Sequence, residues 1–301
     1  MTFADLVARR TRMLTEGSVY ELLRRDPRIR FDPHIAHAGL IYDPVMRTIL
    51  ADVHSRYFEI ARSRRIPQLA FTDTWRASAE RVAASPFHDR SVNRDNVEFL
   101  RAVAEASGGD VFIAGMSGPR GDGYQPAAAP SRTEAAELHR FQIEELAASP
   151  VDVLFAATLP SLDEALGIGD VMASTALPWI VSFVVRPDAA LLDGTSLVDA
   201  IHALDTITPR PLGISINCVH PSIAASAIGR LAPESAARII AFQGNTAALS
   251  PEELDGSDEL LGDDALQFAG AMTPVFDAIP IVGGCCGTDV THMQAVAEKV
   301  G

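Results

Sequence analysis

The sequence is poor in positive charge, and poorest of all in lysine. Its 301 residues include 25 lysines and arginines against 39 aspartates and glutamates, a formal net charge of −14, and Lys299 is the only lysine. So acidic a surface repels phosphate backbones, and we therefore expect no nucleic-acid partner. Schiff-base chemistry is also disfavoured, because we expect the one lysine to lie on a C-terminal helix, away from any site.

Long apolar runs are missing as well. No stretch approaches the roughly 20 apolar residues that a membrane helix requires. The chain starts MTFADLVARRTRM, with charges where a signal peptide has its apolar stretch. We therefore expect a cytoplasmic protein without a membrane partner. Hydrophobic residues still make up 48% of the chain and charged residues 21%, a balance that favours a well-packed globular core over disorder.

Cysteine is scarce, with three residues in all: Cys218, Cys285 and Cys286. An odd number, two of them adjacent, is a poor basis for a disulfide framework. We interpret these side chains as thiols retained for chemistry.

Short runs rich in valine, isoleucine, phenylalanine and alanine alternate with longer segments that have helical spacing of their apolar residues. The predicted strands are Arg12–Thr15, Gln68–Phe71, Val111–Ala114, Val151–Ala156, Trp179–Val185, Leu212–Ile216, Ile239–Phe242 and Ile279–Val282. Between them, Glu134–Ala147 is a clear helix, and the pairs Ser131/Glu134 and Ser161/Glu164 fit capping boxes. This alternation favours an α/β protein with a single (β/α)8 TIM barrel, one domain over residues 1–301. An open doubly wound sheet is the alternative that periodicity leaves open.

Two loops stand out between these elements. Gly121–Pro130 is long enough to lie over a site at the strand ends. The acidic segment Leu249–Asp264 is typical of a solvated surface loop that leads into a helix.

The cysteines follow predicted strands directly: Cys218 after Leu212–Ile216, and Cys285 and Cys286 after Ile279–Val282. In a barrel the carboxyl ends of the strands meet at one face, where active sites are built. Three thiolates around one ion leave a fourth tetrahedral position open, as in catalytic zinc sites, and soft thiolates favour zinc over magnesium or calcium. The pattern therefore predicts a Zn2+ site.

Two other interpretations of these residues remain open. Free cysteines are often small buried hydrophobic side chains. The glycine-rich run Gly283–Thr288 would also suit a phosphate, which the last strands of such barrels often bind. For the metal site, we expect Gly283, Gly284 and Gly287 to take positive φ, so that two adjacent cysteines can face one ion.

The runs Ile216–Cys218 (INC) and Gly283–Thr288 (GGCCGT) resemble the two zinc-ligand motifs of the homocysteine S-methyltransferases, zinc-dependent barrel enzymes that methylate thiols and selenols. Weaker similarity covers most of the chain, at Leu14–Ser18, His54–Ala61, Phe71–Ser78, Ile113–Tyr124, Leu138–Leu146 and Thr158–Ala165. The resemblance implies a methyltransferase that moves a methyl group from a small donor to a zinc-bound thiol such as homocysteine, giving a thioether such as methionine. The three cysteines would be the metal ligands, with no catalytic residue beyond the metal site.

The resemblance also implies a set of substrate-binding positions: Glu16, Gly17, Thr72, Asp73, Thr74, Thr158 and Asn217. One departure bears on the acceptor. Where the family's strand ends in Glu-Thr, this chain has Ala157 and Thr158, and alanine cannot pair with the ammonium group of homocysteine. We therefore expect either a different thiol acceptor or homocysteine bound differently, with Glu16 or Asp73 as the replacement carboxylate.

The donor is less constrained. No GxGxxG motif follows a predicted strand, and we find no further domain for cobalamin or folate. A small donor remains, such as S-methylmethionine, S-adenosylmethionine or a betaine, and the acidic chain favours a cationic one. The alternative function is a barrel that has lost catalysis and binds zinc or another ligand as a sensor or subunit. The oligomeric state is open between monomer and homodimer.

Five further side chains lie near predicted strand ends or helices. We expect His220 to cap a helix rather than to be a fourth zinc ligand, and His139 to be a hydrogen-bonded structural histidine. Trp75, Tyr124 and Phe242 would line the pocket or pack in the core.

Overall fold

Eight parallel strands close into a barrel in the order of the chain, and β8 pairs back with β1. The computed structural model describes residues 1–250, 253 and 262–300. The strands are β1 (Met13–Thr15), β2 (Gln68–Phe71), β3 (Val111–Ser117), β4 (Val153–Leu159), β5 (Trp179–Phe183), β6 (Gly213–Val219), β7 (Ile239–Gly244) and β8 (Ile281–Gly284). The predicted (β/α)8 barrel is confirmed, and the open sheet is excluded because the pairing of β8 with β1 leaves no edge.

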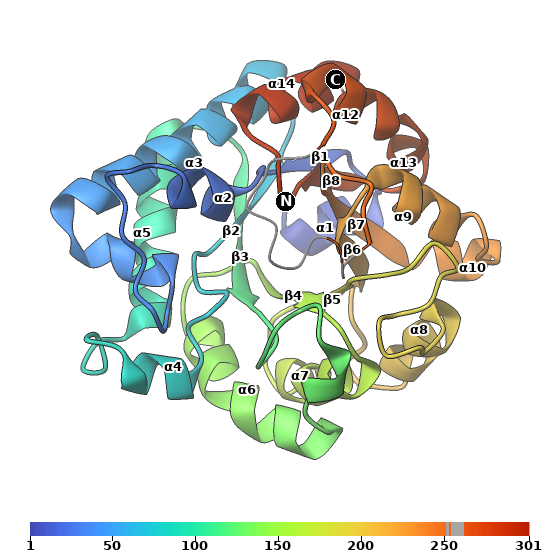
Figure 1. The fold of residues 1–301 in the computed structure, drawn as a ribbon, viewed down its shortest axis with the longest axis horizontal. Coiled ribbons are helices and arrows are strands. Elements are labelled where there is room, and N and C mark those ends of the chain that lie inside the picture. The colour runs from blue at the N-terminus through green and yellow to red at the C-terminus, as the bar shows by residue number, and fades with distance from the viewer. Residues whose placement is uncertain (251–252, 254–261, 301) are drawn as a thin grey trace.

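The helices of the described residues surround the strands as an outer ring, except α1, which lies behind the strands in the view of Figure 1. They are α1 (Phe3–Ala8), α2 (Val19–Arg24), α3 (Pro44–Arg64), α4 (Ala79–Ala84), α5 (Val92–Ser107), α6 (Arg132–Ala147), α7 (Leu162–Ala173), α8 (Leu197–Asp205), α9 (Pro221–Ile228), α10 (Pro233–Ala236), α12 (Ala265–Ala271), α13 (Thr273–Ala278) and α14 (Val290–Val300), with the 3-10 helices η1 (His37–Tyr42) and η2 (Pro126–Ala128). Within the described residues, none is long and apolar enough to cross a membrane. Most of the acidic segment, residues 251–252 and 254–261, lies outside the described part of the chain.

The two predicted capping boxes have different outcomes. Ser131 begins α6, and the Glu134 carboxylate accepts its backbone N–H at 3.0 Å, so the first box is confirmed. Ser161 caps α7 by accepting the N–H of Glu164 at 3.4 Å, but the Glu164 carboxylate does not return to Ser161. Its Oε1 instead accepts the backbone N–H of Arg120 at 2.7 Å and lies 3.0 Å from Nε2 of His139. The second box is therefore only half formed.

Several strands extend further at their carboxyl ends than their apolar runs predict. β6 continues to Val219, so Asn217 and Cys218 lie inside this strand and not after it. β4 starts at Val153 and reaches Leu159, which likewise takes Ala157 and Thr158 into the strand. Both strands change register with a neighbour near these residues, and such bulges let pairing continue past the end of the regular pattern.

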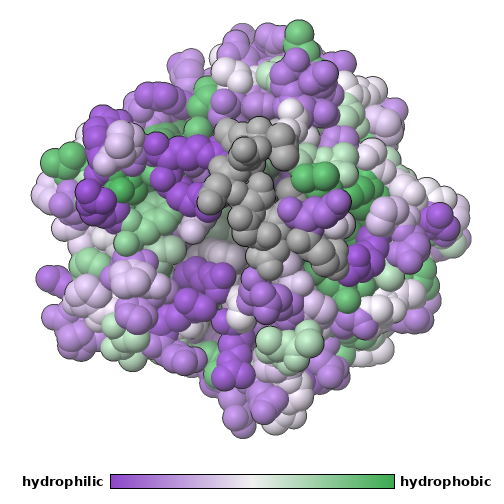
Figure 2. Space-filling model, viewed as in Figure 1, coloured by the Kyte–Doolittle hydropathy of each residue, from purple (hydrophilic) through white to green (hydrophobic). Residues whose placement is uncertain are grey.

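The amino end of the barrel is closed by α1. Its side chains Phe3, Leu6 and Val7 are buried in the same cluster as the barrel-interior residues Met13 and Val153. A pocket is therefore left to the opposite, carboxyl end of the strands, as in other barrels of this type. In the view of Figure 2 the surface is mostly hydrophilic, and its apolar residues are scattered over the face.

Candidate metal centre

The three cysteines meet at the carboxyl end of the barrel. Their sulfur atoms all lie within 4.8 Å of one another, the only such group of potential metal ligands that the described residues form. The Sγ of Cys218 is 2.7 Å from that of Cys285 and 3.9 Å from that of Cys286, and the last two are 4.0 Å apart. The predicted convergence of residues 67 positions apart in the sequence is therefore confirmed.

Near the ends of β6 and β4, two strained backbone positions direct these strands toward the cysteine cluster. Cys218 has φ +56° and Thr158 has φ +65°, values that are uncommon and costly outside glycine. The Asn217 side chain holds the two together: its Oδ1 accepts the N–H of Thr158 at 3.0 Å, and its Nδ2 donates to the Thr158 hydroxyl at 2.7 Å. Ser182 donates to the same Oδ1 at 2.6 Å. Asn217 thus fixes the bulge that directs Cys218 into the barrel mouth.

The loop with the two adjacent cysteines is held by backbone hydrogen bonds. Cys285 N–H donates to Gly244 at 2.7 Å, Thr246 N–H donates to Cys286 at 3.2 Å, and Gly284 N–H donates to Glu16 at 3.0 Å. These bonds fix the loop to the ends of β7 and β1 through its main chain.

The three glycines of this loop do not all take the positive φ that we predicted. Gly287 has φ +82°, as predicted, but Gly283 and Gly284 do not take positive φ. A side chain at Gly283 would collide with Thr15, and one at Gly284 with Thr288. These two glycines are required by close packing against neighbouring segments, and only Gly287 by its backbone conformation.

The protonation of the cluster suits a cation. Hydrogen bonds from the Cys285 and Cys286 thiols lower the pKa of Cys218, which burial alone would raise, and Tyr124 and Thr158 lower that pKa further. The same bonds to Cys218 raise the pKa values of Cys285 and Cys286. The cluster alone therefore holds one thiolate readily, and a bound cation is needed for all three thiols to ionise.

The donor set fits zinc. Tetrahedral Zn–S bonds of about 2.3 Å place neighbouring sulfurs about 3.8 Å apart, close to two of the three distances here. Three soft ligands also match the preference of zinc and leave one position for another group.

The cluster forms part of a pocket of about 340 Å3. Most of the predicted site residues line it, together with Ala157: Glu16, Gly17, Asp73, Thr158, Asn217, Cys218, Cys285 and Cys286. Thr72 and Thr74 do not, since both are fully buried and hydrogen-bonded to each other at 2.7 Å. Thr72 also accepts the N–H of Met116 at 2.9 Å, so this pair joins the end of β2 to β3.

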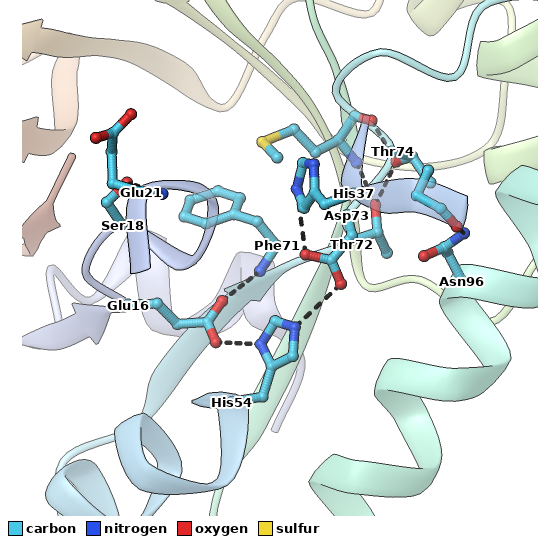
Figure 3. Close-up of polar contacts among 12 residues, drawn as sticks. Glu16, Ser18, Glu21, His37, His54, Phe71, Thr72, Asp73, Thr74 and Asn96 are labelled. Atoms are coloured by element: carbon cyan, nitrogen blue, oxygen red, sulfur yellow. Dashed lines mark hydrogen bonds and ion pairs between the residues drawn. The ribbon is translucent and has the colours of Figure 1, made fainter. Parts of the chain in front are cut away.

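A network of buried histidine and carboxylate side chains lies next to the pocket (Figure 3). His54 of α3 is fully buried, with Nδ1 at 2.5 Å from Glu16 and Nε2 at 3.1 Å from Asp73. Asp73 also lies 3.3 Å from Nε2 of His37, and Glu16 accepts the N–H of Phe71 at 3.1 Å. Both carboxylates proposed to replace the one missing at Ala157 are thus already bound to histidines.

The network keeps His54 protonated. Burial alone would lower the pKa of His54, but the charges of Glu16 and Asp73 outweigh it and raise the pKa to about 10. Burial would raise the pKa of Asp73, yet the charge of His54 and hydrogen bonds from His54 and His37 hold it below its usual range. These effects together favour the protonated imidazole of His54 at neutral pH.

The pH dependence of stability should report this imidazolium. Because the pKa of His54 is raised on folding, its contribution is complete below about pH 6.5 and is lost as pH rises toward 10. The reference is the double variant His54→Leu/Glu16→Gln, which leaves Asp73 paired with His37. The difference in unfolding free energy between wild type and this variant should shrink by about 3–5 kcal/mol from pH 6.5 to 10, as measured by urea denaturation. A constant difference would show that His54 is neutral.

The other predicted side chains are placed as follows. His220 caps α9 by accepting the N–H of Ser222 at 3.2 Å, and it also contacts Asp263 at 3.1 Å. His139 is a buried histidine bonded to Glu164, so both histidine predictions are confirmed. Trp75 and Tyr124 line the pocket, and Tyr124 lies in the predicted loop Gly121–Pro130. Phe242 is fully buried in the core instead.

Sequence reasoning missed several residues of the pocket and its support. His54 appeared only as the first residue of His54–Ala61, a segment with weak similarity to the family. No sequence pattern pointed to His37 or Arg76 individually. Glu21 lines the pocket as well, and burial followed by the charge of Cys286 raises the pKa of its carboxyl group. His54 and His37 have partners from distant parts of the chain, Glu16 and Asp73, so no local pattern identified them.

Comparisons with known proteins agree with this arrangement. The family model for homocysteine S-methyltransferase matches residues 13–300. The homocysteine S-methyltransferase YbgG of Bacillus subtilis is 26% identical over 271 residues, which cover 83% of this chain and 82% of that protein. The selenocysteine Se-methyltransferase of Brassica oleracea var. italica is 21% identical over 168 residues. That match covers 54% of this chain and 48% of the plant protein, so the chain spans about half the length of that relative.

Among solved structures, the metallated form of the homocysteine methyltransferase MmuM from Escherichia coli superposes with a TM-score of 0.76 at 21% identity, over 99% of both chains. Its oxidised form gives a TM-score of 0.75 at 19% identity, over 96% of both chains. At this level of identity the likeness establishes the barrel fold.

Proposed function

Because the chain belongs to the homocysteine S-methyltransferase family and is a methyltransferase, we propose that it transfers a methyl group from a small cationic donor to a thiol at a zinc site. The ligands would be Cys218, Cys285 and Cys286, and residues 1–301 would form a single barrel domain. The observation that carries the proposal is the convergence of three cysteine sulfurs at the base of a pocket at the carboxyl end of the barrel.

Cys218, Cys285 and Cys286 would hold the zinc ion, which would supply the Lewis acidity that lets an acceptor thiol ionise near neutral pH. The chain's own residues shape the surroundings. Asn217 holds Cys218 in its orientation, and the hydroxyl groups of Tyr124 and Thr158 stabilise the Cys218 thiolate. Such hydrogen bonds to a ligand orient it and tune its charge. Methyl transfer then forms a new S–C bond while the donor's bond to the methyl carbon breaks, and no covalent enzyme intermediate is required.

The pocket suits a donor that carries positive charge. Four carboxylates line it, those of Glu16, Glu21, Asp73 and Asp122. The aromatic rings of Tyr20 and Tyr124 also line the pocket, and such rings attract sulfonium and quaternary ammonium groups. S-methylmethionine, S-adenosylmethionine and betaines all belong to this class of cationic methyl donors.

The acceptor is a thiol other than homocysteine, or homocysteine held in another way. Ala157 presents a methyl group to the pocket, and Glu16 and Asp73 are engaged by His54. A carboxylate reserved for the acceptor's ammonium group is therefore not supplied by these three positions.

The metal part of this proposal is tested by elemental analysis of protein purified under reducing conditions. We expect about one zinc per chain and three thiols that react with a thiol reagent only after a chelator has removed the metal. The stripped protein should lose turnover in a screen of thiols against sulfonium and betaine donors, and added zinc should restore it. Zinc-free protein with full turnover would contradict the metal site. Zinc-loaded protein with no turnover for any pair would favour a barrel that binds ligands without catalysis.

A further inference from the structure

We propose that Arg76 binds an anionic group, such as a carboxylate, on the thiol acceptor, and that the acceptor needs no ammonium group. The proposal rests on the proposed function and specifies the class of acceptor: a mercapto carboxylic acid.

Arg76 lies where two cavities meet. It lies in the segment that follows β2, next to Trp75 in the sequence, and it lines the pocket that contains the cysteines. It also lines a second cavity of about 390 Å3, together with Tyr20, Phe31 and Arg81. Tyr20, Trp75 and Arg76 are common to both linings, so the Arg76 side chain borders the pocket that contains the cysteines as well as the second cavity.

Among the residues that the structure describes, Arg76 has few hydrogen-bond partners. A guanidinium group has five N–H donors. One of them donates to the Gly121 carbonyl oxygen at 2.7 Å, and the group stacks over the Trp75 ring at 4.3 Å from its centre. Within residues 1–250, 253 and 262–300, Arg76 forms no ion pair. A stacked guanidinium with free donors is well placed to bind a planar carboxylate at two points.

The charge of Arg76 is also poorly compensated. Burial lowers the pKa of its guanidinium, and the like charge of Arg81 lowers it further, against a smaller opposing effect from Asp122. An arriving anion would relieve both effects. Arg76 and Arg81 line the second cavity together with one carboxylate, that of Asp32, which accepts the backbone N–H groups of His34 and Ile35.

The carboxylates of the pocket, by contrast, already have partners. Glu16 and Asp73 bind His54, and Glu21 pairs with Arg25 at 2.9 Å. Asp122 accepts the N–H of Tyr124 at 2.9 Å. The guanidinium group of Arg76 is the positively charged group of this lining that has no ion pair among the described residues, and we therefore assign the anionic group of the acceptor to it.

The test compares three thiols that differ by one group: homocysteine, 4-mercaptobutanoate, which lacks the amino group, and 3-aminopropane-1-thiol, which lacks the carboxylate. Dissociation constants are measured with cobalt-substituted protein from the thiolate-to-cobalt absorption band, so the readout does not depend on turnover. Loss of the amino group should change Kd less than about 3-fold, and loss of the carboxylate should raise it about 10- to 100-fold, since a hydrogen bond to a charged group contributes about 1.5–3 kcal/mol.

The variant Arg76→Gln keeps a donor for the Gly121 carbonyl and removes the charge. It should weaken binding of homocysteine and 4-mercaptobutanoate about 10- to 100-fold and leave 3-aminopropane-1-thiol unchanged. Arg90→Gln is the matched control, since Arg90 lies over the Tyr42 ring and lines neither cavity. It should leave all three dissociation constants unchanged.

Two results would overturn the proposal while leaving the proposed function intact: equal weakening of all three thiols by Arg76→Gln, or a larger loss from removing the amino group than from removing the carboxylate. A cobalt-loaded protein that shows no thiolate band with any thiol would contradict the proposed function and this proposal together.

Discussion

Replacing Cys286 with alanine is expected to release the metal and to lower the methyl-transfer rate by at least about 10^3-fold, or about 4 kcal/mol in activation free energy. Three thiolates are the smallest set that holds zinc with one position open, and two leave it weakly bound. Zinc per chain, measured by elemental analysis, should fall well below one. Turnover of the best thiol should fall with it.

The control is Ser149→Ala, which changes another small side chain to alanine just before β4, at the amino end of the barrel. Ser149 is 7% exposed, as buried as Cys218 at 6%. This variant should retain its zinc and its turnover, with a small loss of stability from the bond that the Ser149 hydroxyl donates to Glu145. A Cys286→Ala protein that keeps stoichiometric zinc and full turnover would disprove the ligand assignment.

Replacing His54 with leucine is expected to destabilise the protein by about 3–5 kcal/mol. The substitution removes the imidazolium that joins Glu16 and Asp73, so two buried carboxylates lose a shared partner. The measurement is urea denaturation at pH 7, monitored by circular dichroism. Turnover should fall as well, because the displaced carboxylates line the pocket.

A compensated variant separates lost charge pairing from lost packing. The triple change His54→Leu/Glu16→Gln/Asp73→Asn removes every charge of the group that faces His54 and should recover most of the lost stability. His202→Leu, at an exposed position of α8, should change stability by less than about 0.5 kcal/mol. If the single and triple variants are equally unstable, the effect of His54 comes from packing.

The barrel was predictable because each buried strand is a run of apolar residues followed by a helical segment. The carboxyl ends of β4 and β6 could not be predicted, and the reason lies in the backbone of Thr158 and Cys218. Both have positive φ within a bulge, a conformation that leaves no periodic trace in a single sequence. The convergence of the three cysteines could still be predicted, because cysteine is rare here and its position near a strand end does not depend on the exact residue at which the strand stops.

The charged network was harder to predict. His54 lies on the buried side of α3 beside Leu50 and Tyr57, where a histidine has the pattern of an ordinary core residue. Its partners, Glu16 and Asp73, come from the ends of two strands and are 38 and 19 positions away in the sequence. They meet because β1 and β2 are paired neighbours in the sheet and α3, which carries His54, lies between these two strands in the chain.

The way the cysteine loop is held has a consequence for how such a protein can diverge. Gly284, Cys285 and Thr246 fix the loop through main-chain bonds, which survive most side-chain replacements. The wall that an acceptor meets is made of separate side chains, among them Ala157 and Arg76. Substitutions in this wall can therefore accumulate while the arrangement of the three cysteines persists, so the preferred acceptor can change over evolutionary time around an unchanged cysteine cluster.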